Sequence, residues 1–449
     1  MSSSAETDFT DPTLLTRCAE ASLQIARDIA PSAEVEVALA SGSGLSVTVR
    51  GGACELLESE QDKSLAVTIY LDGRKGSATT SDFSADALRA TVGAAHAIAE
   101  QGEADRFAGL AAATDLAADV PDLDLDHPWD IEGEAAIALA LACENAALSA
   151  DARIKQSDGV SVNRYRGARA YANSHGFSGA YRATRHSLSA VMIGAEDAGM
   201  QRGYWYTSAR SPTQLTAPEE VGRLATARTI AKLGARRIPT TEMPVIFEPR
   251  VAGGLVGHLI SAISGSAQYR RASFLLDALG EQVLPEHLEL HEAPHLPGAI
   301  GSAPFDADGI ATREKAIVAA GRLETYLLSA YAARRLNRAP TGNAGGTHNL
   351  ILTPGTRTLE EIIAATDRAL LVTDLMGFGV NGVTGDYSRG AAGFLISRGE
   401  RAHAVEEITI AGNLRDMLMN ITEVGIDVDE SLAVRTGSLC IGRMAIAGS

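Results

Sequence analysis

Apolar and polar residues repeat with two different periods at the start of the chain. Residues 13–29 are apolar at helical spacing and predict an amphipathic helix. Residues 84–100 predict a second helix, with Ser84 as its N-cap. Between the helices, four segments alternate apolar and polar residues and are separated by SGSG, GG and DG, which predict hairpin turns: 34–40, 45–52, 54–61 and 65–73. This order predicts an α+β N-terminal domain, residues 1–115.

The alternating pattern is lost over residues 101–133, where Asp and Pro recur. Three aspartates and a histidine lie close together in this segment: Asp122, Asp124, Asp126 and His127. A metal-binding loop is one interpretation, but the segment lacks the central glycine and the bidentate glutamate of a calcium loop. The stronger interpretation is a solvated linker, which places the boundary of the first domain here.

A second pattern of helices and strands covers residues 116–237, the predicted middle domain. Helices are predicted over residues 132–149 and 216–236, and the second begins with acidic and ends with basic residues, as the helix dipole favours. The segments between them predict a second, mostly antiparallel sheet: 152–159, 161–176, 181–194 and 201–210. His175 and His186 lie in these strands, where a lone histidine is more often structural than a ligand.

Residues 238–449 form the predicted C-terminal domain. A strand is predicted over 241–249, followed by a helix of small and apolar residues that begins near Arg250. A further helix is predicted over 359–369, and the segment SLCIGRM near the C-terminus is strand-like. The chain therefore predicts an α+β fold of several domains, with antiparallel sheets and packed helices.

The sequence His291-Glu292-Ala293-Pro294-His295 matches the zinc motif HExxH letter for letter. That motif needs a helix, so that the two imidazoles share one face. Proline inside a helix costs roughly 3 kcal/mol, and this segment has three prolines around and within it. An extended acidic loop is therefore the stronger interpretation, while a zinc ion held by His291, Glu292 and His295, or with His287 in a non-helical geometry, is the alternative.

Two glycine-rich segments carry polar side chains and predict irregular backbone or turns. The first is TGNAGGTHN, residues 341–349, and it does not fit a phosphate loop because no GK[ST] follows. The second lies within residues 371–394 and is bracketed by strand-like sequence. Hairpin turns are one interpretation, and the walls of a peptide cleft are the other. The candidate substrate-binding residues are Asn343, Gly345, Gly346, Asn349, Asp386, Tyr387 and Ser388.

These segments, in this order, resemble the TldD/PmbA family, and look most like its PmbA branch, also called TldE. The resemblance is carried by GVTGDYSRGAAGF at 382–394 and VEEITIAGNL at 405–414, together with TGNAGG at 341–346. A turn at 73–82 adds the pattern G-R-x-G-S-x-x-T-S-D. The resemblance covers nearly the whole chain and implies a PmbA/TldD-like fold in three parts.

In the catalytic branch of that family, the strand-to-helix passage carries HExxxH, with two zinc-binding histidines and a glutamate as general base. Here Gly257 and Ala262 stand where the two histidines belong, and His258 stands in the place of the glutamate. Neither glycine nor alanine can bind zinc, so the resemblance implies that this chain holds no metal cofactor. The family's third ligand is a cysteine near the C-terminus, where Cys440 is better interpreted as a buried inert thiol.

Composition narrows the class of partner. The net charge of −17 argues against nucleic acid or an anionic membrane as a partner, because both need a basic surface. The four cysteines lie far apart and form no CxxC pair, and the first residues lack the pattern of a secretory signal. We therefore expect a soluble cytoplasmic protein.

The resemblance implies a role in a cytoplasmic peptidase system that acts on extended or unfolded peptides. In that system a TldD-like subunit carries zinc, and the TldE-like subunit helps to bind and enclose the peptide. We therefore expect a non-catalytic subunit that pairs with a TldD-like partner, binds peptides by strand addition, and forms a homodimer when alone. The alternatives are a homo-oligomeric metallopeptidase that is active on its own and a peptide-binding scaffold without a role in proteolysis.

Overall fold

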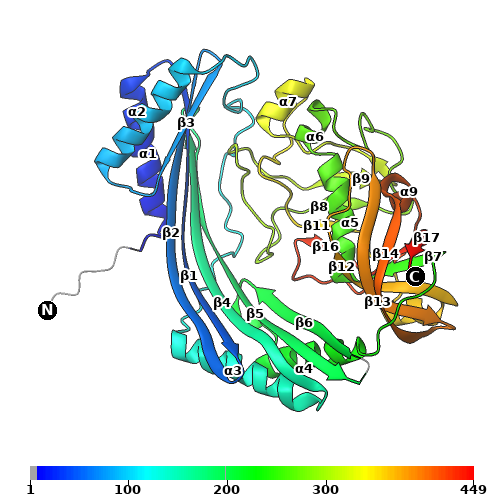
Figure 1. Cartoon of the computed structure of the whole chain (residues 1–449). Helices are drawn as coiled ribbons and strands as arrows, with labels where there is room; N and C mark the ends of the chain where they lie inside the picture. Colours follow the sequence, from blue (N-terminus) through cyan, green and yellow to red (C-terminus); the bar gives the residue numbers. More distant parts are fainter. Residues whose placement is uncertain (1–7, 198, 449) are drawn as a thin grey trace.

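One six-stranded antiparallel sheet carries the first half of the chain (Figure 1). The computed structural model describes residues 8–197 and 199–448. The strands lie in the order β3-β2-β1-β4-β5-β6. Their bounds are β1 (Glu34–Arg50), β2 (Ala53–Leu71), β3 (Arg74–Thr80), β4 (Ile154–Asn173), β5 (Ser178–Glu196) and β6 (Gly199–Ala209).

This single sheet corrects the prediction of two separate ones. Strands β1 and β4 pair in antiparallel register, from Glu36 opposite Asn173 to Val49 opposite Val160. The pairing satisfies backbone groups that would otherwise lie unpaired along two sheet edges. The strands predicted for the N-terminal and middle domains therefore form one continuous surface. The division of the chain at residues 115 and 237 stays a prediction.

Strand β1 also runs straight through the SGSG segment, so the hairpin predicted there is wrong. Gly42 lies opposite Gly167, and the Tyr165 ring lies over both glycines. A Cβ atom added to Gly42 would lie 2.5 Å from the Tyr165 hydroxyl oxygen. These glycines make room for an aromatic ring on the sheet, a use of strand glycine that local sequence does not distinguish from a turn.

The two other predicted hairpin turns are confirmed, with the positive φ angles that two-residue turns require, at Gly51, Gly52, Asp72 and Gly73. Four helices cover the outer face of the sheet: α1 (Pro12–Ile29), α2 (Ala85–Gln101), α3 (Gly133–Ala150) and α4 (Pro218–Ala231). Ser84 caps α2 as predicted, because its side chain accepts a hydrogen bond from Ala87 N. Helix α4 is shorter than the predicted 216–236.

Alternation along the strands decides which side chains face these helices. Val35, Val37 and Leu39 of β1 pack under α1 and α2 with the even-numbered alanines of β4. The intervening residues lie on the other, concave face, which curves around the C-terminal half of the chain (Figure 1). The outer face is therefore core, and the inner face is free to form a site.

The C-terminal half is built on a second six-stranded sheet, ordered β14-β13-β12-β7-β17-β15. Strand β14 also pairs with β17, so five of these strands close on themselves. Strands β7 and β12 are parallel, and their other neighbours are antiparallel. The bounds are β7 (Thr241–Phe247), β12 (Arg368–Met376), β13 (Asp386–Ser397), β14 (Glu400–Asn413), β15 (Ile421–Val424) and β17 (Leu439–Ala447).

A smaller sheet packs beside it, in the order β10-β9-β8-β11-β16. Its strands are β8 (Leu290–Glu292), β9 (Lys315–Ala319), β10 (Arg322–Leu323), β11 (Leu350–Leu352) and β16 (Val434–Arg435). The helices are η1 (Pro212–Gln214), α5 (Pro249–Ala262), α6 (Gly265–Tyr269), α7 (Ala330–Leu336), α8 (Leu359–Ala364) and α9 (Leu414–Met419). Helix α8 ends five residues before the predicted boundary at 369. The buried face of α5 lies in the largest apolar core.

Polar contacts join the two halves. Arg334 of α7 donates hydrogen bonds to the carbonyl oxygens of Phe107, Gly109 and Leu110. Helix α4 forms ion pairs with the C-terminal half through Arg228–Glu248 and Lys232–Asp374. These contacts hold the concave face of the first sheet against the C-terminal loops. Within the described residues, no helix combines the length and the apolar character needed to cross a membrane.

Candidate functional site

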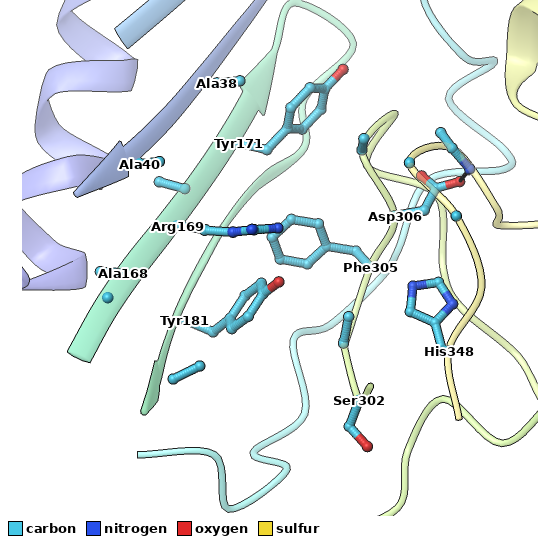
Figure 2. Close-up of a pocket in the computed structure, with 18 of the residues that line it drawn as sticks. Ala38, Ala40, Ala168, Arg169, Tyr171, Tyr181, Ser302, Phe305, Asp306 and His348 are labelled. Atoms are coloured by element: carbon cyan, nitrogen blue, oxygen red, sulfur yellow. Dashed lines mark hydrogen bonds between the residues drawn. The ribbon is translucent and has the colours of Figure 1, made fainter. Parts of the chain in front are cut away.

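A cavity of about 640 Å³ lies between the concave face of the first sheet and two loops of the C-terminal half (Figure 2). Strands β1, β4 and β5 form one wall, and the segments 300–307 and 344–348 form the other. Arg169, Tyr171 and Tyr181 extend from the sheet toward the opposite loops. The volume is in the range typical of ligand sites in proteins.

The alternation of β4 explains why its polar side chains face the cavity. Ala168 and Ala170 belong to the buried core beneath the outer helices, which turns Arg169 and Tyr171 to the opposite side. Tyr171 donates a hydrogen bond of 2.9 Å to Glu36. None of the ion pairs among the described residues includes Arg169, so its guanidinium is available to a ligand.

Aromatic side chains form the apolar part of the wall. The Phe305 ring packs edge-on against Phe177, with ring centres 5.1 Å apart, and against Tyr181 at 5.6 Å. Phe305 and Tyr181 both line the cavity. The rings hold each other in place, so the cavity combines a rigid apolar surface with one free positive charge.

Glu292 organises the loops on the C-terminal side. Its side chain is fully buried and accepts hydrogen bonds from Lys315 Nζ at 2.7 Å, from Asn343 Nδ2 at 2.9 Å and from His348 N at 2.6 Å. Burial opposes the charge of this carboxylate, but these bonds and the Lys315 charge outweigh burial and lower its pKa. Glu292 is therefore a buried, ionised hub that joins three separate segments of the chain.

The same carboxylate orients His348, whose ring lines the cavity. His348 Nδ1 lies 3.1 Å from Glu292 Oε1. Because Glu292 is ionised and can only accept, Nδ1 of His348 carries a proton and donates it to this hydrogen bond. The hydrogen bond fixes the orientation of the His348 ring at the wall of the cavity.

Asp306 ties the two cavity loops to each other. Its carboxylate accepts hydrogen bonds from the backbone N–H groups of Asp308 and Ile310 on one side and of Ala344 on the other. Burial, followed by the nearby charge of Asp308, raises the pKa of Asp306 to about 6. The protonation of Asp306 is therefore coupled to the geometry of the cavity.

The first group of predicted residues lies at or directly behind this cavity. Gly345 and Gly346 line it, and both have positive φ angles, of 90° and 134°, which favour glycine. Asn343 is buried and binds Glu292 and the Gly346 carbonyl oxygen. Asn349 is also buried, and its side chain binds Ala293 O and Ser302 Oγ. The two asparagines therefore hold the loops in place, and the glycines form the surface.

The second group lies elsewhere, at the start of β13. Asp386 and Ser388 are exposed, whereas Tyr387 is only 2% exposed and packs into the core. None of the three lines the cavity. Strands β12 and β13 bracket this glycine-rich segment, but β13 already begins at Asp386, so residues 386–391 pair with β14 and are not the irregular backbone predicted there. A substrate-binding role for these three residues stays a prediction.

The HEAPH segment is not helical, as its prolines predicted, but only its first two residues are extended, and Pro294 and His295 lie in a turn. It begins in β8, so successive side chains point to opposite sides. His291 pairs with Glu289 at 2.9 Å, and His295 binds Thr312 at 2.9 Å, while Glu292 is buried in its own network. His291, Glu292 and His295 therefore have separate partners, and the geometry is not that of a zinc-binding helix.

The aspartates of the linker are also engaged separately. Asp126 forms an ion pair with Arg166 at 2.7 Å, and Asp124 lies 3.3 Å from His127. In residues 8–197 and 199–448, no three His, Cys, Asp or Glu side chains are grouped as metal ligands. His186 is buried and lies 2.9 Å from the His127 carbonyl oxygen, and burial lowers its pKa, as for a structural histidine.

The comparisons with known proteins agree along the chain. Three family models match: PmbA/TldA metallopeptidase domain 1 over residues 35–99, the central domain over 126–233 and the C-terminal domain over 240–448. Metalloprotease PmbA of Escherichia coli O157:H7 is 44% identical over 413 residues, which cover 92% of each chain. The chain therefore belongs to the PmbA/TldD family of metallopeptidases.

Further relatives extend this comparison. The metalloprotease PmbA homolog of Haemophilus influenzae is 43% identical over 418 residues, 93% of each chain. The crystal structure of a protein from Bacteroides thetaiotaomicron, described there as a candidate modulator of DNA gyrase, has a TM-score of 0.91 at 28% identity and covers 96% of this chain and 98% of its own. TldE from Thermococcus kodakarensis shares the fold, with a TM-score of 0.81 at 19% identity over 97% of this chain and 100% of its own.

The family name implies a metal, and the residues on α5 do not fit one. Gly257 has no side chain, and Ala262 is buried with only a methyl group. Burial, followed by the nearby charge of Arg389, lowers the pKa of His258, and a guanidinium disfavours a nearby dication. Cys440 belongs to a different apolar cluster, and burial raises its pKa to about 12.

Sequence reasoning missed Arg169, Tyr171, Tyr181, Phe305 and His348. One signal for the strand residues was present. In the stretch GARAYA, small alanines alternate with Arg and Tyr, the pattern of a strand with a helix on one face and a site on the other. No local signal marks Phe305 or His348, because their place depends on loops that meet only in the fold.

Proposed function

We propose that this chain is a peptide-binding subunit of a PmbA/TldD-type metalloprotease and does not itself carry the zinc. The observation that carries the proposal is the cavity beside the concave sheet in a chain of a metallopeptidase family. The resemblance to the catalytic branch supports it, because it aligns Gly257 and Ala262 of α5 with the two zinc-binding histidines. Such a chain has a place for a ligand but lacks zinc ligands at the position of the family motif.

The lining of the cavity suits an extended peptide. The rings of Tyr181 and Phe305 offer an apolar surface, and Arg169 offers an unpaired positive charge. Gly345 and Gly346 allow a peptide backbone to approach closely. The cavity can hold only a few residues, so a longer peptide extends beyond it.

The catalytic zinc is supplied, in this proposal, by a TldD-like partner in the cytoplasm, with which this chain forms a heterodimer or a larger assembly. Peptide is held between the two subunits and cleaved at the partner's metal. The chain forms a homodimer when the partner is missing.

Replacement of Arg169 tests the peptide-binding role. Arg169→Gln should weaken the binding of an unfolded acidic decapeptide to the isolated chain about tenfold, because one charge-assisted hydrogen bond is lost. Calorimetric titration measures the change. Arg27→Gln is the matched control, because Arg27 is exposed on α1, on the outer side of the sheet. Equal binding by the two variants would show that the cavity is not the peptide site.

The alternative is a homo-oligomeric enzyme that cleaves peptides on its own. It is favoured by the name metalloprotease, which the 44% identical relative carries. Peptidase assays with the purified chain, with and without a chelator, separate the two proposals. Chelator-sensitive cleavage by the chain alone would support the alternative over the non-catalytic subunit.

A further inference from the structure

A cluster of donor groups lies where α5 meets the start of β13, outside the cavity described above. It consists of His258 on α5 and of Tyr387 and Arg389 on β13. The rings of His258 and Tyr387 pack edge-on, with centres 6.0 Å apart. Tyr387 and Arg389 are two residues apart on one strand, so both side chains lie on the same face of the sheet.

Two atoms of this cluster are buried without a partner. Neither Tyr387 Oη nor Arg389 Nε has a hydrogen-bond partner among the described residues. Leaving a buried polar group unsatisfied costs on the order of 1–3 kcal/mol. Nor does Arg389 take part in any ion pair within residues 8–197 and 199–448. Two such groups side by side are the arrangement expected where a ligand completes the hydrogen bonds.

Helix α5 leaves open space beside them. Gly254 lies one turn before His258 on α5, so these two residues share a face, while Gly257 directly precedes His258 and lies on the neighbouring face. A Cβ atom built on either glycine would meet no other atom within 4 Å. Gly254 therefore leaves room beside His258 on this face of the helix.

The charges of the cluster select the kind of ligand. Burial raises the pKa of Tyr387 to about 12, although the charge of Arg389 and a side-chain interaction with it oppose the shift, so the phenol stays protonated. Burial and the Arg389 charge both lower the pKa of His258. The fixed positive charge of Arg389 and the phenol donor together favour an anion with oxygen acceptors, and planar oxygens match a guanidinium best.

We propose that His258, Tyr387 and Arg389 form a carboxylate-binding site at the position where the catalytic branch of the family would hold its metal. Resting on the proposed function, the site takes a carboxylate of the bound peptide, either the C-terminal carboxylate or an acidic side chain. Arg389 and Tyr387 donate to its oxygens, and His258 supplies the adjoining wall. In this proposal, the site binds either the C-terminus or one acidic side chain of the peptide and so fixes the position of the peptide.

The anion site can be tested without any peptide. The full chain, with ¹³C-labelled histidine, is titrated with sodium acetate and followed by NMR, and His258→Gln identifies the His258 signal. The signal should shift in a saturable way in the natural chain and should not shift in Arg389→Gln. The control is Arg368→Gln, an equal change of charge at an exposed position on β12. An unchanged His258 signal in the natural chain, or equal shifts in both variants, would overturn the proposal.

Peptides then distinguish the two sources of carboxylate. Three decapeptides are compared by calorimetry: one with a free C-terminus, the same peptide amidated, and an amidated peptide with one added Glu. Arg389→Gln should weaken the peptide that carries the recognised carboxylate about tenfold and leave the amidated, Glu-free peptide unchanged. Tyr387→Phe should weaken it less, with no loss of melting temperature, because the hydroxyl has no partner to lose.

The two proposals fail in different ways. If Arg169→Gln weakens all peptides and Arg389→Gln weakens none, the peptide-binding function stands and the carboxylate site does not. If acetate binds at His258 but no peptide binds the chain, the site stands and the proposed function fails.

Discussion

Glu292 joins separate segments of the chain through its buried carboxylate, a role that the HExxH match of its segment does not indicate. It lies in a segment that spells a zinc motif, yet its carboxylate is occupied by Lys315, Asn343 and His348. The network holds the loop that lines the cavity and orients the His348 ring. Replacing a whole buried network of this kind with apolar residues changes the free energy of unfolding little. Removing one member alone leaves the other buried charges uncompensated and destabilises the fold.

Glu292→Gln should lower the free energy of unfolding by about 3 kcal/mol, because Lys315 loses its partner and an amide N–H₂ then faces other donors. Urea unfolding at pH 7 measures the loss. The stabilising effect of Glu292 should be present above its unfolded pKa, near 4.5, and should disappear as the pH falls through its lowered folded value. Glu289→Gln is the control: this side chain is exposed, so a change below about 0.5 kcal/mol is expected. Equal effects of the two substitutions on the free energy of unfolding would show that the buried network of Glu292 does not stabilise the fold.

Asp306 should give the opposite dependence on pH. Its pKa is raised from 3.8 to about 6, so the folded chain binds more protons than the unfolded chain in that window. The free energy of unfolding should therefore fall as the pH rises from about 4 to about 6, by up to about 3 kcal/mol from this group. Asp306→Asn should reduce that slope, measured by urea unfolding at several pH values. Glu36 and Asp308 also have raised pKa values, mainly through burial. The variant should therefore still show a smaller dependence of the free energy of unfolding on pH. Identical slopes would show that Asp306 titrates normally.

At the scale of elements, glycine positions reveal which packing contacts are closest. A Cβ atom on Gly76 of β3 would lie 2.0 Å from Ala95 O and 2.3 Å from Ala99 N, both backbone atoms of α2. The helix therefore packs directly on the strand, and no flexible side chain could yield. This contact gives a physical reason for glycine in the G-R-x-G turn pattern.

Gly76→Ala should destabilise the chain by about 3 kcal/mol, because α2 must move away from β3. Gly93→Ala, on α2 itself, should instead stabilise it by about 0.5–1 kcal/mol, since no atom lies within 4 Å of the added methyl group and alanine favours a helix. Thermal and urea unfolding of the two variants measure both signs. A small loss in the free energy of unfolding for Gly76→Ala would contradict the direct packing of α2 on β3.

The pattern of apolar residues predicted most elements but not how they pair. Helices α1 and α2, the GG and DG turns, and the non-helical HEAPH segment all follow from local spacing and turn chemistry. The continuity of β1 through SGSG and its pairing with β4 could not be predicted from local sequence. They involve Tyr165, which packs over Gly42 from more than a hundred residues away. The site divides in the same way: Gly345 and Gly346 were found from sequence, whereas Arg169 and His348 needed the fold.

At the scale of the whole molecule, the curved sheet and the C-terminal half enclose a cavity that neither forms alone (Figure 1). Ion pairs from α4 and hydrogen bonds from Arg334 hold the two halves together. The same C-terminal half carries α5, where Gly257 and Ala262 have no side chain that could bind a metal ion. We propose on this basis that this family member binds peptide and leaves the metal to a partner.

The zinc content of the purified full chain, measured by elemental mass spectrometry after dialysis, tests this claim most directly. If a partner subunit holds the zinc, we expect far less than one zinc ion per chain, and no peptidase activity until a TldD-like subunit is added. Close to one zinc per chain, with activity that a chelator removes, would contradict it. Attention would then move to His287, His291 and His295 as ligands in a rearranged loop.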